Sequence, residues 1–273
     1  MSFHLSDQAY RKIRRFFFEQ SGIDLPENKR HLVEGRLRNR LLTLGFECYG
    51  AYFEHVMRPD QSHERQLLID ILTTNETYFF REPQHFKLLS EQILPSLPAA
   101  PRIWCAAASS GEEPYSLAML LADKALNKPW DLLATDLSRR ILARAERGLY
   151  AMQRLELMPA DYLKRFCLRG TGDYEGYFLV RPEIRERVSF RQHNLLDSPA
   201  LLGRFDVIFL RNVLIYFSQA TKQKVLDLVL GQLKPGGWLI VGHAESLHGL
   251  NLNLEQIRPS VFRSPQRFSL RSA

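Results

Sequence analysis

The chain has 273 residues, 45% of them hydrophobic, and a formal net charge of +7. This length provides one large or two modest domains with a sizeable core. The first residues lack the apolar stretch of a signal peptide, and no apolar run approaches the ~20 residues that span a bilayer, so we expect a cytoplasmic protein without direct membrane insertion. The positive charge predicts an acidic partner, but nucleic acid, anionic lipid and a Glu-rich protein all qualify.

The cysteines and histidines indicate neither disulfides nor a metal site. Cys48, Cys105 and Cys167 are odd in number and far apart in the sequence, which is typical of a reducing compartment. The eight histidines show no metal-ligand spacing. We therefore expect no metal.

The first part of the chain, residues 1–74, predicts an all-α domain. Tyr10, Ile13 and Phe17 share one face of a helix expected over residues 6–18. Further helices are expected from Pro26 onward and over residues 49–57, 64–72 and 85–93.

The helix that begins at Pro26 has two chemically different faces. Its apolar positions are Leu32, Val33, Leu37, Leu41 and Leu42. Its basic positions are Lys29, Arg30, Arg36, Arg38 and Arg40. Such a basic face is either solvated or a docking surface for an acidic helix, and the sequence does not choose between them.

Residues 75–101 predict a linker and lid segment. The sequence TTNETYFFRE at 73–82 is dense in hydrogen-bonding groups although it contains three consecutive aromatics, a mixture that can fold over a ligand. Three prolines within residues 94–101 then predict a domain boundary.

From residue 102 onward, strands and helices alternate. Strands are expected over 102–107, 130–136, 188–193, 205–210 and 238–242. Helices are expected over 115–125, 138–148 and 219–233. A turn is expected at 234–237, and Phe262 with residues 267–270 is expected to form a closing hairpin strand. The alternation predicts an α/β domain over residues 102–273, with a mostly parallel sheet covered by helices on both faces. An irregular, Gly-rich piece near 158–187 predicts a small inserted β-subdomain, whose edge strand can pair with an extended peptide.

The turn AAASSGEEPYS at 106–116 carries the clearest functional signal. Gly111 permits a tight turn and close approach of a ligand, and Pro114 suits the first turn of a helix. A strand, a small-residue turn and a helix start together form a nucleotide cradle. Glu112 and Glu113 disfavour phosphate and favour a ligand with hydroxyls and a positive centre, which describes S-adenosylmethionine.

Polar residues follow the other expected strands. Asp136 lies 25 residues after the glycine of the turn, where an acidic residue binds ribose hydroxyls, although it could also cap the next helix. Asn194, beside Leu195, is either an adenine contact or an ordinary turn residue. Arg211 and Asn212 end the fourth strand, where ligands of such sheets bind; a surface ion pair is the alternative for Arg211.

Five segments resemble the chemotaxis receptor glutamate O-methyltransferases, the CheR family. They are TTNETYFFRE at 73–82, AAASSGEEPYS at 106–116, RGTG at 169–172, FLRNVLIYF at 209–217 and GHAES at 242–246. The resemblance runs from the first helices nearly to the last strand. It implies an all-α N-terminal domain followed by an S-adenosylmethionine-dependent methyltransferase domain of Rossmann-like fold with a small inserted β-subdomain. Ala244, where many relatives carry Ser, is a small departure.

The resemblance also implies a set of site residues. The expected contacts of S-adenosyl-L-methionine, or of the product S-adenosyl-L-homocysteine, are Asn75, Thr77, Arg81, Glu113, Asp136, Asn194, Leu195, Arg211 and Asn212. Glu113 is preferred to Glu112, but one sequence does not settle that choice. The expected catalytic pair is Arg81 and Tyr216.

The implied reaction is methylation of glutamate side chains on chemotaxis receptors in sensory adaptation. The implied partner is the cytoplasmic helical domain of a chemoreceptor, facing the basic N-terminal helix. The length of the insert resembles that of relatives which bind a C-terminal receptor pentapeptide, and nothing demands more than a monomer.

Two other functions are compatible with parts of the sequence. A nucleic-acid methyltransferase would explain the basic charge, but amino-methylating DNA enzymes usually carry an Asp/Asn-Pro-Pro-aromatic tetrad where this chain has Arg211-Asn-Val-Leu. A non-catalytic S-adenosylmethionine-binding receptor scaffold is disfavoured by the intact cradle and by Tyr216, and only an assay separates it from an enzyme.

Overall fold

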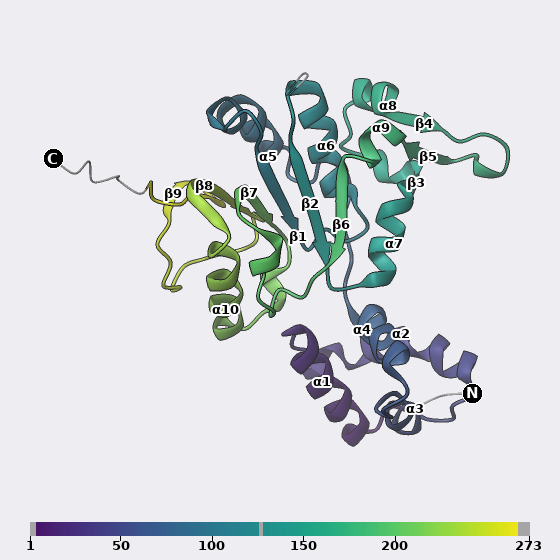
Figure 1. Ribbon diagram of the computed structural model, residues 1–273. Helices are drawn as coiled ribbons and strands as arrows, with labels where there is room; N and C mark the ends of the chain where they lie inside the picture. Colours follow the sequence, from purple (N-terminus) through teal and green to yellow (C-terminus); the bar gives the residue numbers. More distant parts are fainter. Residues whose placement is uncertain (1–3, 126–127, 267–273) are drawn as a thin grey trace.

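A computed structural model describes residues 4–125 and 128–266 and shows a helical part joined to a sheet part (Figure 1). The helical part contains α1 (Asp7–Ser21), η1 (Glu27–Lys29), α2 (Arg30–Leu44), α3 (Tyr49–Val56) and α4 (Ser62–Leu72). Helix α1 begins where the Ser6 side chain accepts a hydrogen bond from the N–H of Ala9, and it ends at Gly22 in the left-handed conformation.

The expected apolar face of α1 is confirmed, and that of α2 is confirmed in part. Tyr10, Ile13 and Phe17 of α1 are buried. On α2 the buried residues are Val33, Leu37 and Leu41, whereas Leu42 is 52% exposed. The apolar stripe of α2 is therefore narrower than the sequence suggested.

Several basic residues of α2 hold the fold together. Arg30 pairs with Asp7, Nη1 to Oδ1 at 2.6 Å. Arg40 pairs with the buried carboxylate of Glu64, which also accepts a hydrogen bond from the Tyr52 hydroxyl. These side chains are engaged within the domain, so the α2 surface is not simply a solvated charged face.

Within the described residues, the large sheet has seven strands in the order β6-β2-β1-β7-β8-β10-β9. They are β6 (Val188–Gln192), β2 (Asp131–Asp136), β1 (Arg102–Ala106), β7 (Phe205–Leu210), β8 (Leu233–Val241), β10 (Val261–Arg263) and β9 (Glu255–Arg258). The first five are parallel and the last two antiparallel. The predicted α/β class is confirmed. Because β1 is flanked by β2 and β7, the strand order reverses beside β1, where such sheets bind ligands outside the carboxyl ends of their strands.

The helices of the sheet part follow the expected order with shifted ends. They are α5 (Pro83–Leu88), α6 (Glu112–Lys124), α7 (Arg139–Arg147) and α10 (Gln219–Leu230). The helix expected over 85–93 is α5 followed by the π-helical turn η2 (Leu89–Ile93) and the 3-10 turn η3 (Leu94–Ser96).

Two predictions concern the C-terminal side: the expected turn is wrong, and the closing hairpin is confirmed for Phe262. The turn expected at 234–237 lies inside β8, because buried Leu233 already pairs with Phe205 before the pairing shifts register and resumes at Trp238 against Val207. A strand can absorb such an irregularity as a bulge. The closing hairpin is formed by β9 and β10; Phe262 belongs to β10, and residues 267–270 lie outside the described residues.

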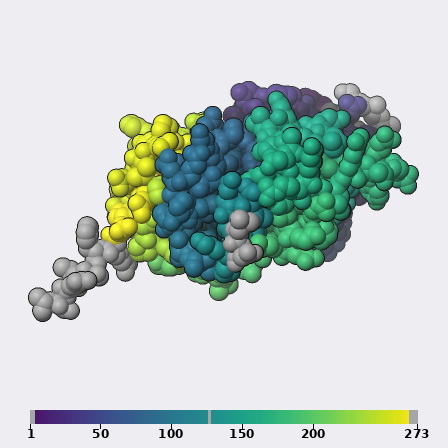
Figure 2. Space-filling view, turned by 90° about the horizontal axis from the view of Figure 1, so that it is seen from above, coloured from purple at the N-terminus to yellow at the C-terminus, as the bar shows by residue number. Residues whose placement is uncertain are grey.

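The insert contains a second, antiparallel sheet of order β3-β5-β4, as far as the described chain shows. Its elements are β3 (Leu149–Ala151), η4 (Met152–Leu155), α8 (Ala160–Phe166), β4 (Cys167–Arg169), η5 (Gly172–Tyr174), β5 (Tyr177–Val180) and α9 (Pro182–Arg185). Strand β3 begins before the insert expected near 158–187. The sequence did not predict this strand, because three residues are too few to show the alternation of apolar and polar residues that indicates a strand. The insert projects at one side of the sheet, and β9 and β10 lie at the other (Figure 2).

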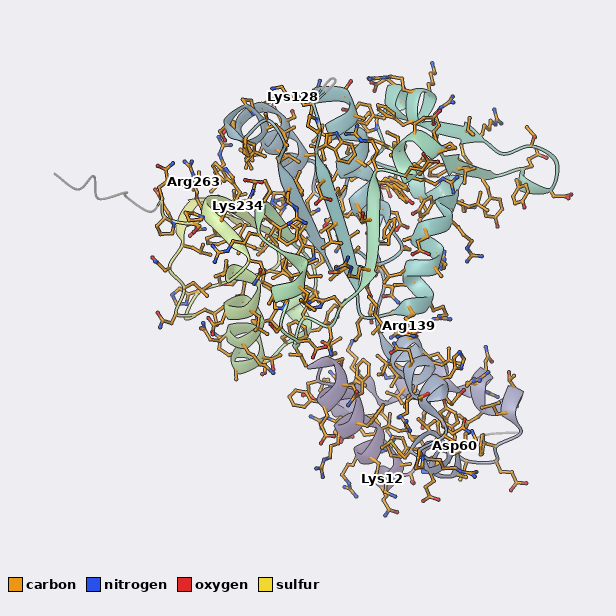
Figure 3. The ribbon with its side chains drawn as sticks, viewed as in Figure 1. Lys12, Asp60, Lys128, Arg139, Lys234 and Arg263 are labelled. Carbon is orange, nitrogen blue, oxygen red and sulfur yellow. The ribbon has the colours of Figure 1, made fainter. Side chains whose placement is uncertain are left out.

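The helical part lies against one end of the sheet (Figure 1). Ile23 forms an isolated antiparallel bridge with Phe217, and the Asn194 side chain donates to the carbonyl oxygen of Gln20 at 2.7 Å. Arg139 lies near this junction, whereas Lys12 lies at the far end of the helical part (Figure 3). Among the described helices, none is long and apolar enough to cross a membrane.

Candidate functional site

A cavity opens where the carboxyl ends of β1, β2, β6 and β7 meet the helical part. Its volume is about 850 Å³, counting the solvent at its open mouth. All ten predicted site residues line it: Asn75, Thr77, Arg81, Glu113, Asp136, Asn194, Leu195, Arg211, Asn212 and Tyr216. The structure thus brings together residues that are spread over 142 positions, from Asn75 to Tyr216, counting both ends.

The cavity also has lining residues that were not predicted from the sequence, and two of them come from the helical part. Ser21 at the end of α1 and Ile23 just after it line the wall, as does His193 after β6. Ser21 and Ile23 carry no motif, and only the docking of the helical part on the sheet brings them there.

The turn after β1 has the conformation that its small residues permit. Ala107, Ser109 and Gly111 have φ of +63°, +51° and +97°. A Cβ on Gly111 would lie 2.7 Å from the hydroxyl of Tyr150 and 2.8 Å from the Cβ of Ala145. Gly111 is therefore required both by its backbone angle and by close packing.

Asp136 is held by backbone N–H groups at the end of β2. Its Oδ2 accepts from the N–H of Ser109 at 2.8 Å and its Oδ1 from the N–H of Ser138 at 2.9 Å. Burial raises the pKa of this carboxyl, and both hydrogen bonds oppose the rise. The alternative of a helix cap is wrong, because Ser138 caps α7 by accepting from the N–H of Ile141.

The two glutamates of the cradle point to different places. Glu113 lines the cavity and accepts a hydrogen bond from the Cys105 thiol at 3.2 Å. Glu112 is 1% exposed, accepts from the Ser110 hydroxyl at 2.6 Å and lies 3.8 Å from Arg154. The geometry thus supports the choice of Glu113 as the cavity residue.

Arg211 lies in the interior and not on the surface. Its guanidinium pairs with Glu113 through Nη1 and with Glu82 through Nη2 at 3.1 Å. Nη2 also donates to the carbonyl oxygen of Arg81 at 2.6 Å. One guanidinium between two carboxylates leaves this cluster with a net negative charge beside the cavity. Because Arg211 lies in the interior, the alternative of a surface ion pair is wrong.

The segment 73–82 is tied to its surroundings through its carbonyl oxygens. Arg36 of α2 donates to the carbonyl oxygen of Thr73 at 3.0 Å, and Arg154 of η4 donates to that of Thr77 at 2.5 Å. Phe79 is fully buried against Tyr150 and against Phe178 of the inserted sheet. The segment 73–82, expected as a lid and called the strap below, is therefore held in place by all three parts of the fold.

A buried carboxylate that the sequence analysis did not assign shapes the turn bearing Tyr216. Glu245 accepts hydrogen bonds from four backbone N–H groups, those of Asn212, Val213, Leu214 and Gly242, at 2.6 to 2.9 Å. Asn212 has φ +58°, and Tyr216 ends the 3-10 turn η7 (Leu214–Tyr216). The GHAES motif was the available signal, since its glutamate follows the end of β8.

Two histidines that are far apart in sequence meet at Glu82. Among the described residues, one ligand-type atom each from Glu82, His85 and His243 lie within 4.8 Å of one another. Burial and, to a smaller extent, the charge of Arg211 lower the pKa of His85 to about 3. The carboxylate of Glu82 is already engaged by Arg211, and the absence of a metal stays a prediction.

Comparison with known proteins places the chain in a family. Residues 8–73 match the CheR methyltransferase all-alpha domain, and residues 75–262 match the CheR methyltransferase SAM binding domain. The "Chemotaxis protein methyltransferase" of Escherichia coli K12 is 41% identical over 249 residues, covering 90% of this chain and 87% of the relative.

Two further curated relatives support the same family. "Chemotaxis protein methyltransferase 2" of Pseudomonas aeruginosa PAO1 is 41% identical, covering 89% of this chain and 88% of the relative. The "Chemotaxis protein methyltransferase" of Vibrio parahaemolyticus is 38% identical, covering 93% and 94%. A glycopeptide N-methyltransferase, MtfA, complexed with S-adenosylmethionine, is 19% identical with a TM-score of 0.37 over 70% of each chain, too low to support an argument. On the family models and the curated relatives, the chain belongs to the CheR methyltransferase family.

Proposed function

We propose that this chain transfers a methyl group from S-adenosylmethionine to glutamate side-chain carboxylates of chemoreceptors and forms methyl esters. One observation carries the proposal: ten residues, chosen from the sequence for cofactor binding and catalysis, all line one cavity at the carboxyl end of the sheet. The names of the relatives support a substrate in chemotaxis. The basic charge fits a nucleic-acid substrate as well as an acidic protein, and none of the other observations above favours nucleic acid.

The residues around the cavity fit S-adenosylmethionine chemically. Asp136, oriented by two N–H groups, has the position and charge to accept hydrogen bonds from ribose hydroxyls. Asn194 and Leu195 supply an amide and an apolar surface for the adenine. Glu113 and its net negative cluster with Arg211 suit a ligand that bears a positive centre.

The receptor glutamate needs no general base. Its carboxyl group has an ordinary pKa near 4.3, so it is ionised at neutral pH. When bound, the cofactor supplies a sulfonium methyl group, the electrophile of the reaction. The protein must strip water from the carboxylate and hold one oxygen about 3–3.5 Å from the methyl carbon.

Arg81 is placed to position that carboxylate. Its guanidinium donates a hydrogen bond from Nη1 to the carbonyl oxygen of Glu76 at 3.1 Å, and it lies over the Tyr78 ring at 5.5 Å from the ring centre. The remaining donors can bind a carboxylate as a fork. Contact that is too tight would weaken the nucleophile, so we assign Arg81 to positioning.

Tyr216 offers a second point of contact. Burial raises the pKa of its phenol, and nearby Arg81 opposes the rise. The hydroxyl therefore keeps its proton at neutral pH and can donate one hydrogen bond to the substrate carboxylate.

The proposed partner surfaces are the basic side of α2 and the exposed side chains of the insert. We propose that the helical domain of the receptor binds the basic surface of α2. Two basic residues of this helix, Arg30 and Arg40, already pair with acidic residues of the chain itself. The insert exposes Leu168, Tyr174 and Tyr177 by 39%, 58% and 43%. Such exposed apolar side chains beside an edge strand support binding of a receptor C-terminal pentapeptide. We expect a monomer in the cytoplasm.

The deciding experiment is methyl transfer from labelled S-adenosylmethionine to receptor-rich membranes, followed by mild alkali. Release of the label as methanol is the expected result, because carboxyl esters hydrolyse in alkali. Alkali-stable label would exclude a glutamyl ester. Tight cofactor binding without any transfer would indicate the scaffold instead.

A further inference from the structure

Glu82 lies where the strap enters helix α5, in an unusual conformation. Its φ is +58°, in the left-handed region that non-glycine residues seldom adopt. Pro83 follows in the first turn of α5. A backbone held in this region indicates that contacts elsewhere compensate the strain, and such residues cluster at functional sites.

The carboxylate of Glu82 joins three elements. Its Oε1 accepts from the side-chain amide of Asn212 at 3.2 Å, after β7. Its Oε2 accepts from the N–H of His243 at 3.1 Å, after β8, and pairs with Arg211 Nη2 at 3.1 Å. The side chain is only 14% exposed, so these contacts are shielded from solvent and strengthened relative to surface pairs.

Through Arg211, Glu82 acts on the residues assigned to the reaction. The Nη2 atom that binds Glu82 also donates to the carbonyl oxygen of Arg81, while Nη1 binds Glu113. Glu82 is not among the residues that line the cavity. Its influence on Arg81 and Glu113 is therefore exerted through Arg211 and through the backbone.

We propose that Glu82 is a positioning residue for methyl transfer, which fixes Arg211 and the backbone of Arg81 so that Arg81 and Glu113 face the cavity. This proposal rests on the proposed function for its reaction. His85 lies beside the same carboxylate, with its Nδ1 3.3 Å from Glu82 Oε2, and the rings of His85 and His243 meet edge to face at 4.6 Å between centroids.

The test compares Glu82→Gln, Glu82→Asp and the control Glu91→Gln, which changes an exposed carboxylate of η2. Gln has the same size but lacks the charge that holds Arg211, and Asp keeps the charge but falls short by one methylene. Four quantities are measured for each variant: the melting temperature, the affinity for S-adenosylhomocysteine by calorimetry, and kcat and KM for receptor methylation.

For Glu82→Gln we expect kcat to fall about 100-fold, because small misplacements of reacting groups have effects of that size. The affinity for S-adenosylhomocysteine should fall about tenfold and KM for the receptor should change little, while the melting temperature should fall because buried Arg211 loses one of its two carboxylate partners. Glu82→Asp should be intermediate, and Glu91→Gln should match the wild type.

The proposal is overturned if folded Glu82→Gln keeps both kcat and S-adenosylhomocysteine affinity within threefold of the wild type. Should Glu82→Gln not fold, the Asp variant decides, and wild-type values for it would overturn the proposal. Failure of the proposed function would look different, since the wild type itself would then form no alkali-labile ester. The calorimetric comparison would still test Glu82 in that case.

Discussion

Acidification provides a test of the packing around His85 that does not depend on the reaction. His85 is 2% exposed, its Nε2 lies 2.9 Å from the Ser260 hydroxyl, and burial with Arg211 nearby lowers its pKa to about 3. In the unfolded chain the pKa of a histidine is near 6.5. Below pH 6.5 the unfolded state therefore binds a proton that the folded state refuses, so the free energy of unfolding decreases as the pH falls.

The size of the effect follows from the two pKa values. Each pH unit between them lowers the free energy of unfolding by about 1.4 kcal/mol. Between pH 6.5 and pH 5 this single group removes about 2 kcal/mol. The Glu82 carboxylate stays ionised over this interval, because the Arg211 charge and hydrogen bonds outweigh burial and lower its pKa. His243 and Arg211 face the same ring.

The assay is urea denaturation followed by tryptophan fluorescence at pH 5.0, 5.5, 6.0, 6.5 and 7.0. All three tryptophans, Trp104, Trp130 and Trp238, belong to the sheet part, so the signal reports on the part that buries His85. His85→Gln should be less stable at pH 7 but should lose the slope assigned to His85.

Two other histidine variants serve as controls. Burial also lowers the pKa of His193, so His193→Gln should remove a separate part of the slope. His63 is exposed, and His63→Gln should leave the slope unchanged. Equal slopes for the wild type and for His85→Gln between pH 6.5 and 5 would refute the reasoning.

Three further predictions test the cavity and the helical part. Arg81→Ala should reduce single-turnover methylation at least 100-fold without lowering the melting temperature, because its guanidinium lines the cavity and makes few internal contacts; an unchanged rate would remove Arg81 from the mechanism. Asp136→Asn should weaken S-adenosylhomocysteine binding in calorimetry about 10- to 100-fold, since hydrogen bonds to a charged group contribute about 1.5–3 kcal/mol; full affinity would exclude ribose binding by this carboxylate. Glu64→Ala should destabilise the helical part by about 3 kcal/mol, because Arg40 and the Tyr52 hydroxyl lose a partner that is 5% exposed. Circular dichroism during denaturation measures this loss, and an unchanged midpoint would contradict it.

Local sequence patterns predicted most of the fold. The caps Ser6 and Ser138 and the left-handed Gly148 mark helix ends that the sequence signals directly. The prediction failed where long-range pairing outweighs local preference. Residues 234–237 contain Pro and two Gly and indicate a turn, yet pairing of Leu233 with Phe205 draws them into β8.

Several residues that line the cavity were predictable because they follow the strands of the sheet. Asp136, Asn194 and Arg211 come at or just after the ends of β2, β6 and β7, and in a parallel sheet these ends meet at one edge. The segment 75–81 does not follow a strand, and only its family resemblance assigned it to the site. Glu82 and Glu245 were missed because a buried carboxylate that serves backbone N–H groups looks like any other glutamate in a sequence.

The sequence by itself determined the alternating strands and helices, the cradle at 106–116 and the family. The tertiary structure alone decided which glutamate of the cradle faces the cavity. Consecutive residues of a helix point about 100° apart, so the orientation of α6 against the sheet directs Glu113 into the cavity and Glu112 toward Ser110 and Arg154. Docking of the helical part likewise decided that Ser21 and Ile23 complete the wall. Such choices depend on how packed elements are rotated and placed, which a local pattern of residues does not specify.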